Sequence, residues 1–423
     1  MAEKNKKNFL PSNLSAEEMK APKVDSAHIE DFKTPEEIAS AEANETGAVL
    51  GSHEPIMNEA PSQKIPKDPS PIKDKLVNFY KGHKKACIIG GVILVLVLVG
   101  GAYMLLKPEK KAVIAPIKVV KKVEAAKTVP STLSGLPVDP STNLRPVTGV
   151  MIENSLDARP QAGLGQAGVV YEAIAEGGIT RFLALFQDTA PENIGPIRSA
   201  RPYYVQWAMG FDAGYAHVGG SPEAIANIRD WGVKDLDQFY NSGAYHRTSD
   251  RAAPHNVYSS STALSQLEAA KGYTSSTFTG FIRNAKAKPI KLPTAKSIDM
   301  AISSASYNVH YDYNVKTNSY DRSEGSAPHI DANTNTQISP KVAIAMVTSY
   351  GIQSDGKHSE YGVIGSGQAF VFQNGEVIVG TWTKADNKSQ TTFTDAAGAV
   401  LKLNAGQTWI TTLSDATKLN YVP

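Results

Sequence analysis

The chain has 423 residues, 41% of them apolar, and a formal net charge of +2 at neutral pH. This length and apolar content suffice for one large domain or two average ones, and the near-neutral charge argues against a nucleic-acid partner. The basic excess is local, because residues 107–132 hold seven lysines against only two glutamates.

Residues 1–85 mix lysine, glutamate, alanine and serine with eight prolines and no sustained apolar period. Proline interrupts helices, and such a segment buries too little apolar surface to offset its conformational entropy. We therefore expect a disordered cytoplasmic tail over residues 1–85. It is either a solvated segment or a docking peptide for a cytoplasmic partner.

Residues 86–106, ACIIGGVILVLVLVGGAYMLL, contain no charged side chain. As a helix they span roughly 30 Å, the thickness of a bilayer core. They start too far along the chain for a cleavable signal peptide, so we predict a single transmembrane helix, with residues 107–132 as a linker. Lysines flank both ends, so the positive-inside rule does not fix the orientation. We place the C-terminal domains outside the cell membrane because the folded part of single-span anchors usually lies there.

The segment after the linker alternates strand and helix signals. Short runs rich in β-branched and aromatic residues predict four strands, at residues 147–154, 168–175, 180–187 and 213–218. Three helices are predicted, each starting at or just after a serine that can act as N-cap. They cover residues 199–211, 221–232 and 260–272.

Residues beyond about 289 are mostly β-prone, and Asn374-Gly375 between two apolar runs is the strongest hairpin signal of the chain. The predicted fold is an α/β (α+β) N-terminal lobe over residues 133–288. A mostly antiparallel β C-terminal lobe follows over residues 289–423. The two lobes are built either on one shared sheet or on two.

The stretch AEGGITRFLALFQDTAPENIGPIRSARPYY, residues 175–204, holds three arginines, Arg181, Arg198 and Arg201. Two of them stand at the start of a predicted helix, where the helix dipole disfavours positive charge. A nearby anion is therefore expected. It is either a ligand phosphate or carboxylate, which arginine can clamp bidentately, or an internal carboxylate. The internal candidates are Glu176, Asp188 and Glu192.

Glu176 ends a predicted strand just before Gly177-Gly178. A glutamate at this position is either a general acid with a raised pKa, as in glycosidases, or one half of an ion pair at the strand end. In the first case Asp188 or another carboxylate would assist it.

Two further groups of residues contain candidate ligands. In AHVGGSPEA, two glycines lead to a helix and can form an anion-binding nest. There His217 is either a base or a satisfied core histidine, and Ser221 is either part of the nest or a helix cap. In YHRTSDRAAPHNVY, residues 245–258, His255 and Asn256 either form one wall of a cleft with Arg198 and Arg201 or belong to a solvated loop. His246, Asp250 and His255 match no standard zinc spacing, so we expect no metal. No phosphate-binding or dinucleotide motif occurs, so we expect no cofactor.

Several long strings resemble one bacterial family. GVMIENSLDARPQAGLGQAGVVYEAIAEGGITRFLALF, GPIRSARPYY and APHNVY are similar to the YerB-like lipoprotein family, a family of domains of unknown function. The resemblance extends over roughly residues 130–423. It implies two membrane-tethered, extracytoplasmic domains and carries no catalytic residues over. The chain departs from the family pattern in its anchor, where an internal helix replaces an N-terminal lipoprotein signal.

Three functions remain open at this stage. A binding module of the cell envelope would recognise an anionic wall polymer or peptide through Arg181, Arg198 and Arg201, with Asn154 and Asn256 orienting it. A peptidoglycan glycan-cleaving enzyme would use Glu176 as general acid, with a second carboxylate about 5–10 Å away. A scaffold for envelope proteins would have no polar cleft beside these residues.

Overall fold

The computed structural model describes residues 81–105 and 127–423. Residues 1–80 of the predicted disordered tail and 107–126 of the predicted linker lie outside the described residues. Helix α3 covers Lys84–Leu105, close to the predicted 86–106. Among the described helices, it is the one long and apolar enough to cross a membrane, by length and composition. The described residues 127–423 belong to a separate compact unit, which is described by itself below.

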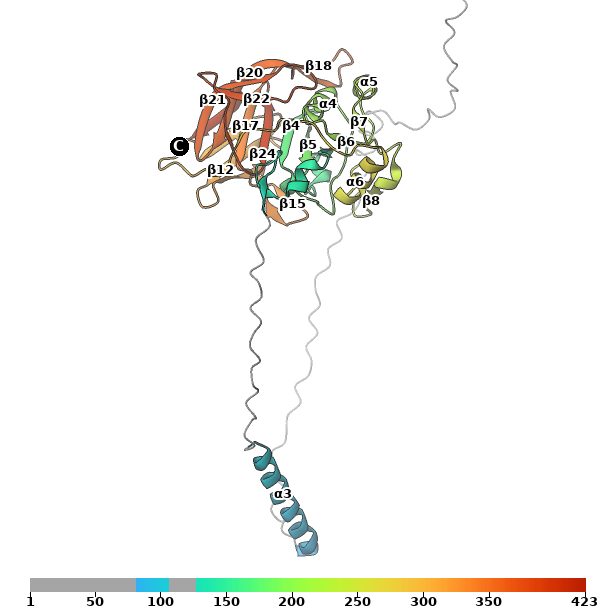
Figure 1. The fold of residues 1–423 in the computed structure, drawn as a ribbon, viewed down its shortest axis with the longest axis vertical. Coiled ribbons are helices and arrows are strands. Elements are labelled where there is room, and N and C mark those ends of the chain that lie inside the picture. Colours follow the sequence, from blue (N-terminus) through green and yellow to red (C-terminus); the bar gives the residue numbers. More distant parts are fainter. Residues whose placement is uncertain (1–80, 106–126) are drawn as a thin grey trace, which may run out of the picture. The chain divides into compact units, whose positions relative to one another are not determined.

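A mixed ten-stranded sheet is the centre of this unit (Figure 1). Its strand order is β22-β21-β20-β17-β24-β4-β5-β3-β6-β7. The earlier strands are β3 (Thr148–Glu153), β4 (Val169–Ile174), β5 (Thr180–Phe186), β6 (Gly214–Ala216) and β7 (Lys234–Asp235). The later strands are β17 (Val342–Val347), β20 (Gly365–Gln373), β21 (Glu376–Lys384), β22 (Thr392–Asp395) and β24 (Thr408–Leu413). Both halves of the sequence therefore share one sheet, since β24 pairs with β4.

The central strands are covered on both faces. Every residue of β3, β4 and β5 is buried, as expected of strands that lie between two layers. One face packs against Tyr204 and Trp207 of α4 (Pro202–Met209) and Ile228 of α5 (Pro222–Asp230). The other face packs against Leu264 of α6 (Ser261–Ala270).

Two of the three predicted helix caps are confirmed. The Ser221 hydroxyl accepts from the Ala224 N–H, and the Ser260 hydroxyl accepts from the Ala263 N–H. The predicted cap at Ser199 is wrong. Helix α4 begins at Pro202 with Arg201 as its N-cap residue in an extended conformation. The ring of a proline disfavours helical geometry in the residue before it, so the helix cannot start earlier.

A five-stranded antiparallel sheet packs beside the central one. Its order is β14-β13-β12-β11-β25, with β11 (Ser297–Met300), β12 (Val309–Asn314), β13 (Ser319–Glu324), β14 (Ala327–Pro328) and β25 (Leu419–Val422). Tyr311 and Tyr320 of this sheet share a core cluster with Phe372 of β20. The predicted hairpin at Asn374-Gly375 is confirmed, because both residues have positive φ and join β20 to β21.

The remaining strands are short and form two-stranded ladders. They are β1 (Val129–Pro130), β2 (Pro137–Val138), β8 (His246–Arg247), β9 (Val257–Tyr258), β10 (Arg283–Asn284), β15 (Ile330–Asp331), β16 (Thr336–Gln337), β18 (Tyr350–Ile352), β19 (Ser359–Tyr361) and β23 (Leu403–Asn404). The coarse expectation of a mixed α/β fold with a β-rich C-terminal part is confirmed.

Candidate functional site

Six mutually parallel strands of the central sheet end at the same edge, which we call the carboxyl edge. They are β17, β24, β4, β3, β6 and β7. Asn154, Glu176 and His217 follow three of these strands. Strand β5 runs the opposite way and places Arg181 at its start. Ligands of open α/β sheets bind outside the carboxyl ends of strands, so this edge is the expected position of a ligand site.

Glu176 lies between two guanidiniums. Its Oε2 is 2.8 Å from Arg181 Nη2, and its Oε1 accepts from Arg201 Nε. The two arginines are also fixed to the backbone, because Arg181 donates to the Ser199 carbonyl and Arg201 to the Ala200 carbonyl. The side chain of Arg201 is 7% exposed and that of Glu176 is 28% exposed. The expected anion near Arg201 is therefore an internal carboxylate.

This pairing argues against Glu176 as a general acid. Burial raises the pKa of the Glu176 carboxyl, but the charges of Arg181 and Arg201 outweigh burial and leave the pKa below its ordinary value. A general acid needs a raised pKa to hold its proton near neutral pH. The geometry around Glu176 therefore favours the ion pair at the strand end, and catalysis by Glu176 stays an untested alternative.

Asp188 does not assist Glu176. Glu176 precedes β5 and Asp188 follows it, so the two carboxyl groups lie at opposite ends of the strand. At about 3.3 Å per residue, the strand alone separates them by roughly 20 Å, well beyond the spacing of a glycosidase pair. Asp188 instead accepts from the Ser131 hydroxyl.

Arg198 has a different partner from Arg201. Its Nε lies 3.0 Å from Oε1 of Glu153, the last residue of β3. The Glu153 side chain is 4% exposed, whereas that of Arg198 is 24% exposed. Within residues 127–423 the two terminal nitrogens of Arg198 have no hydrogen-bond partner. Among the three arginines predicted to bind an anion, Arg198 therefore has donors left for a ligand.

His255 and Ser155 complete this second cluster. The Nδ1 atom of His255 is 3.0 Å from Glu153 Oε1 and 3.1 Å from the Ser155 hydroxyl. A serine nucleophile needs one ring nitrogen to itself while the carboxylate occupies the other. Here both partners share one nitrogen, so the cluster is not a catalytic triad. The second oxygen of Glu153 is buried and has no partner in the described part of the chain.

Asn154, a predicted ligand-orienting residue, is fully buried. Its side-chain amide donates to Glu324 Oε1 at 2.5 Å and to the Thr180 hydroxyl at 2.6 Å. Its carbonyl oxygen accepts from Arg159 Nε and Gln161 Nε2. All its hydrogen-bonding capacity is used internally, so Asn154 supports the edge from inside and has no donor or acceptor left for a ligand.

Three further candidates are also satisfied by their own surroundings. His217 is fully buried, with its ring nitrogens 2.7 Å from the Gly219 carbonyl and 3.0 Å from Asp235 Oδ1. Ser221 caps α5, as described above. Asn256 donates to the Thr248 and Arg251 carbonyls of its own loop. The hydrogen bonds of these three side chains therefore stabilise the local backbone and its neighbours, and they are not directed at a ligand.

Metal binding finds no support in the geometry. In the part of the chain that the structure describes, no group of three or more His, Cys, Asp or Glu residues is arranged to hold a metal ion. His246 and Asp250 lie at the exposed surface, while His255 is committed to Glu153.

A cleft of about 260 Å³ opens beside the first turn of α4. It is lined by Pro202 and Tyr203 of α4, Glu223 and Trp231 at the two ends of α5, and Tyr361 of β19. The Tyr203 hydroxyl donates to the Ile174 carbonyl, two residues before Glu176. The cleft is therefore adjacent to the Glu176–Arg201 pair, since its lining residue Pro202 directly follows Arg201.

Two residues at this edge were not expected from sequence. Glu153 is the partner of Arg198 and directly precedes Asn154. Its position at the end of a predicted strand could have identified it as a candidate site residue. His358 Nε2 lies 4.0 Å from Glu176 Oε1, and its backbone bridges that of Glu176. No local pattern connects His358 with a residue 182 positions earlier, so only the tertiary structure reveals this contact.

The chain matches known proteins over most of its folded part. Residues 133–274 match the N-terminal domain, and residues 298–410 the C-terminal domain, of the family described as "protein of unknown function (DUF3048)". The chain is 30% identical over 296 residues to "Putative lipoprotein YerB" of Bacillus subtilis (strain 168), covering 69% of this chain and 88% of that protein. A crystal structure of the YerB protein from Bacillus subtilis matches with a TM-score of 0.64 and 28% identity. It covers 70% of this chain and all of the other. The resemblance stated from the sequence is confirmed.

Proposed function

This chain belongs to the DUF3048 family, and we propose that it is a membrane-anchored, extracytoplasmic protein of the bacterial cell envelope that binds an anionic wall polymer or peptide. Helix α3 is the anchor, the tail of residues 1–85 is cytoplasmic, and residues 133–423 are extracytoplasmic. The name of the Bacillus subtilis relative, a lipoprotein, supports membrane association. The length and apolar composition of α3 support a spanning segment.

One observation carries the binding proposal. At the carboxyl edge three guanidiniums, those of Arg181, Arg198 and Arg201, face two carboxylates, those of Glu153 and Glu176. The five side chains therefore carry one excess positive charge. Burial and the charge of Arg181 lower the pKa of Arg201 from its ordinary value, which reflects two cations sharing one carboxylate. A ligand anion relieves that repulsion.

Arg198 is the residue of this group that contacts the ligand. Its terminal nitrogens are unpaired within the described residues, and its side chain is the most exposed of the three arginines. A guanidinium binds a carboxylate or phosphate through two parallel hydrogen bonds. Arg181 and Arg201 contribute mainly positive potential, since two nitrogens of each are already bonded to Glu176 and to a backbone carbonyl and both side chains are nearly buried.

Co-sedimentation with purified wall sacculi tests the proposal. The full chain in detergent is mixed with intact sacculi and with sacculi stripped of their anionic polymers by hydrofluoric acid. We expect binding to the intact sacculi, at least fivefold weaker binding to the stripped ones, and weakening with salt because the attraction is screened. Arg198→Gln should reduce binding to intact sacculi by at least fivefold.

Arg229→Gln is the matched control. Arg229 lies on α5, its side chain is 75% exposed, and it pairs only with its neighbour Asp230. This variant should bind like the parent. Equal binding of Arg198→Gln and parent would refute the role of Arg198. Equal binding to intact and stripped sacculi would exclude the anionic polymer as the ligand and leave the peptide. Release of soluble muropeptides during the incubation would favour the enzyme class instead.

A further inference from the structure

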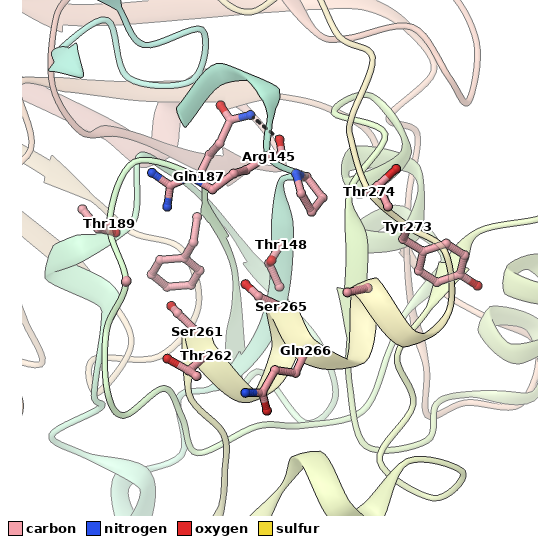
Figure 2. A pocket seen from close by; sticks show the side chains of 14 residues that line it. Arg145, Thr148, Gln187, Thr189, Ser261, Thr262, Ser265, Gln266, Tyr273 and Thr274 are labelled. Atoms are coloured by element: carbon pink, nitrogen blue, oxygen red, sulfur yellow. Dashed lines mark hydrogen bonds between the residues drawn. The ribbon is translucent and has the colours of Figure 1, made fainter. Parts of the chain in front are cut away.

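Two of the described cavities differ in the chemistry of their lining. A cavity of about 560 Å³ lies between α6 and the ends of β3 and β5 (Figure 2). Its accessible lining is mostly apolar, and its one charged side chain, Arg145, donates to the Thr142 hydroxyl, so it selects no particular ligand. The smaller cleft beside the first turn of α4, described above, has a mostly polar accessible lining and two charges of one sign. We call it the acidic cleft.

The charged side chains of the acidic cleft are both carboxylates. Glu223 lies in the first turn of α5 and Glu360 lies on β19, and both residues are exposed to solvent. No described lysine, arginine or histidine lines the cleft. Neither carboxylate forms an ion pair with another residue in the described part of the chain. The cleft therefore presents two negative charges to a ligand, and no cation of its lining balances them.

The amide side chains of the acidic cleft leave further oxygen acceptors free. Gln353 donates through Nε2 to Glu223 Oε2 at 2.6 Å, and Gln206 donates through Nε2 to Asn387 Oδ1. The Oε1 atom of each glutamine accepts no hydrogen bond from a described residue. Both glutamines are only half-buried, so a ligand in the cleft can reach them. A ligand that matches this lining is a cation that brings N–H donors.

One face of α5 and the residue that ends it supply three of the lining groups. Glu223, Asn227 and Trp231 line the cleft and follow each other at intervals of four residues, a spacing that places side chains on the same face of a helix. Trp231 is half-buried, so part of its indole ring is accessible. The face of an indole attracts a cation that lies within about 6 Å of the ring centre. A carboxylate, an amide and an aromatic ring therefore line one wall, and Glu360 comes from the opposite one.

We propose that the acidic cleft binds an organic ammonium group, with its N–H donors on the carboxylates and amide oxygens and its hydrocarbon part against Trp231. A primary ammonium has three donors and no acceptor, which matches a lining rich in free oxygens. A metal ion fits less well, since no described group of three or more His, Cys, Asp or Glu residues is arranged to hold one. The ammonium belongs either to a peptide side chain or to a free amine. The proposal does not depend on anion binding by Arg198, which does not line the cleft.

Calorimetric titration of the full chain in detergent tests the acidic cleft. The probes are Nα-acetyl-lysine N-methylamide, whose only charge is the side-chain ammonium, and pentylamine, a free amine of the same chain length. Nα-acetyl-norleucine N-methylamide is the uncharged control. We expect saturable binding of at least one ammonium probe, at least tenfold tighter than the norleucine compound and weakened by salt. Tighter binding of the lysine compound assigns the cleft to a peptide-borne ammonium, and tighter binding of pentylamine assigns it to a free amine.

Carboxylate variants test which residues bind the ammonium. Glu223→Gln/Glu360→Gln should weaken binding at least tenfold, and Glu360→Gln alone, which leaves α5 unchanged, at least threefold. Both side chains are exposed, so the thermal midpoint should stay near that of the parent. Glu192→Gln is the matched control, because Glu192 is an exposed carboxylate that does not line the cleft. It should bind the probes within twofold of the parent.

Tryptophan fluorescence locates the bound probe. Of the four tryptophans in the sequence, Trp207, Trp382 and Trp409 are at most 2% exposed, so acrylamide quenching reports mainly on Trp231. A saturating ammonium probe should reduce this quenching in the parent and leave it unchanged in Trp231→Phe.

Four results would overturn the proposal. They are the absence of saturable ammonium binding at millimolar concentration, equal binding of the norleucine compound, parent-like binding by the folded double variant, and displacement of the ammonium probe by calcium at lower concentration than the probe itself. Arg198→Gln should keep ammonium binding within twofold of the parent while it loses sacculus binding, so this proposal and the proposed function fail separately.

Discussion

The carboxylate of Glu172 and the guanidinium of Arg322 face each other inside the core. Nη2 of Arg322 lies 2.9 and 3.0 Å from the two oxygens of Glu172, and neither side chain has any exposed surface. Glu172 belongs to β4 and Arg322 to β13, so the pair joins the two family-matched segments. Trp409 packs against this ion pair. The centroid of its ring lies 4.4 Å from Cζ of Arg322, and its Nε1 donates to Oε2 of Glu172.

Arg322→Met should strongly destabilise the compact unit of residues 127–423. It leaves the Glu172 carboxylate buried without its cation, and breaking a buried pair from one side costs about 3–5 kcal/mol. Adding Glu172→Gln should recover part of this loss, because no charge is then left unpaired. Urea denaturation measures both variants. A single variant within about 1 kcal/mol of the parent would contradict this account.

Arg201→Gln should lower the unfolding free energy by about 1–3 kcal/mol. This is less than for a fully buried pair, because Glu176 is partly exposed and keeps Arg181. The exposed Arg229→Gln should leave stability at the parent value. A double-mutant cycle of Arg201→Gln with Glu176→Gln should give a coupling above about 0.5 kcal/mol. Additive effects would show that the two side chains do not interact in solution.

Glu268 predicts a pH dependence of stability. Burial raises the pKa of its carboxyl to about 7, against an ordinary value of 4.5. The folded state therefore keeps its proton to higher pH than the unfolded state. The unfolding free energy should fall by up to about 3 kcal/mol as the pH rises from 4.5 to 7. In Glu268→Gln this contribution is absent while the bond from Thr148 can persist.

Urea denaturation of the parent and of Glu268→Gln at pH 5, 6, 7 and 8 checks this sign. The stability advantage of the variant over the parent should grow across this range. Parallel pH profiles would mean that the Glu268 carboxyl titrates alike in the folded and unfolded chain.

The proposed topology predicts which positions an impermeant maleimide reaches in intact cells. In a Cys87→Ser background, which removes the single native cysteine, Ala397→Cys in an exposed turn should be labelled without lysis. Ser26→Cys in the tail should be labelled only after lysis. The reverse pattern would place the folded unit in the cytoplasm.

Local features of the structure were predictable from the sequence. The caps at Ser221 and Ser260 bond to residues three positions ahead, so a short window contains both partners. The Asn374-Gly375 turn depends on two adjacent residues that tolerate positive φ. The apolar run at 86–106 likewise predicts its own helix. The start of α4 also depends on a local feature, because Pro202 disfavours helical geometry at Arg201 and so overrides the capping tendency of Ser199.

The candidate site was decided by the tertiary structure. Arg198 pairs with Glu153, 45 residues earlier, and Glu176 meets His358, while Asp188, close in sequence to Glu176, lies at the far end of β5. These relationships follow from the order and direction of strands in a sheet that mixes both halves of the chain. Hydrophobic periodicity specifies which residues form a strand and which face is buried. It does not specify which other strand will pair with it. The partner of each charge, and therefore the charge left for a ligand, is set only when the sheet assembles.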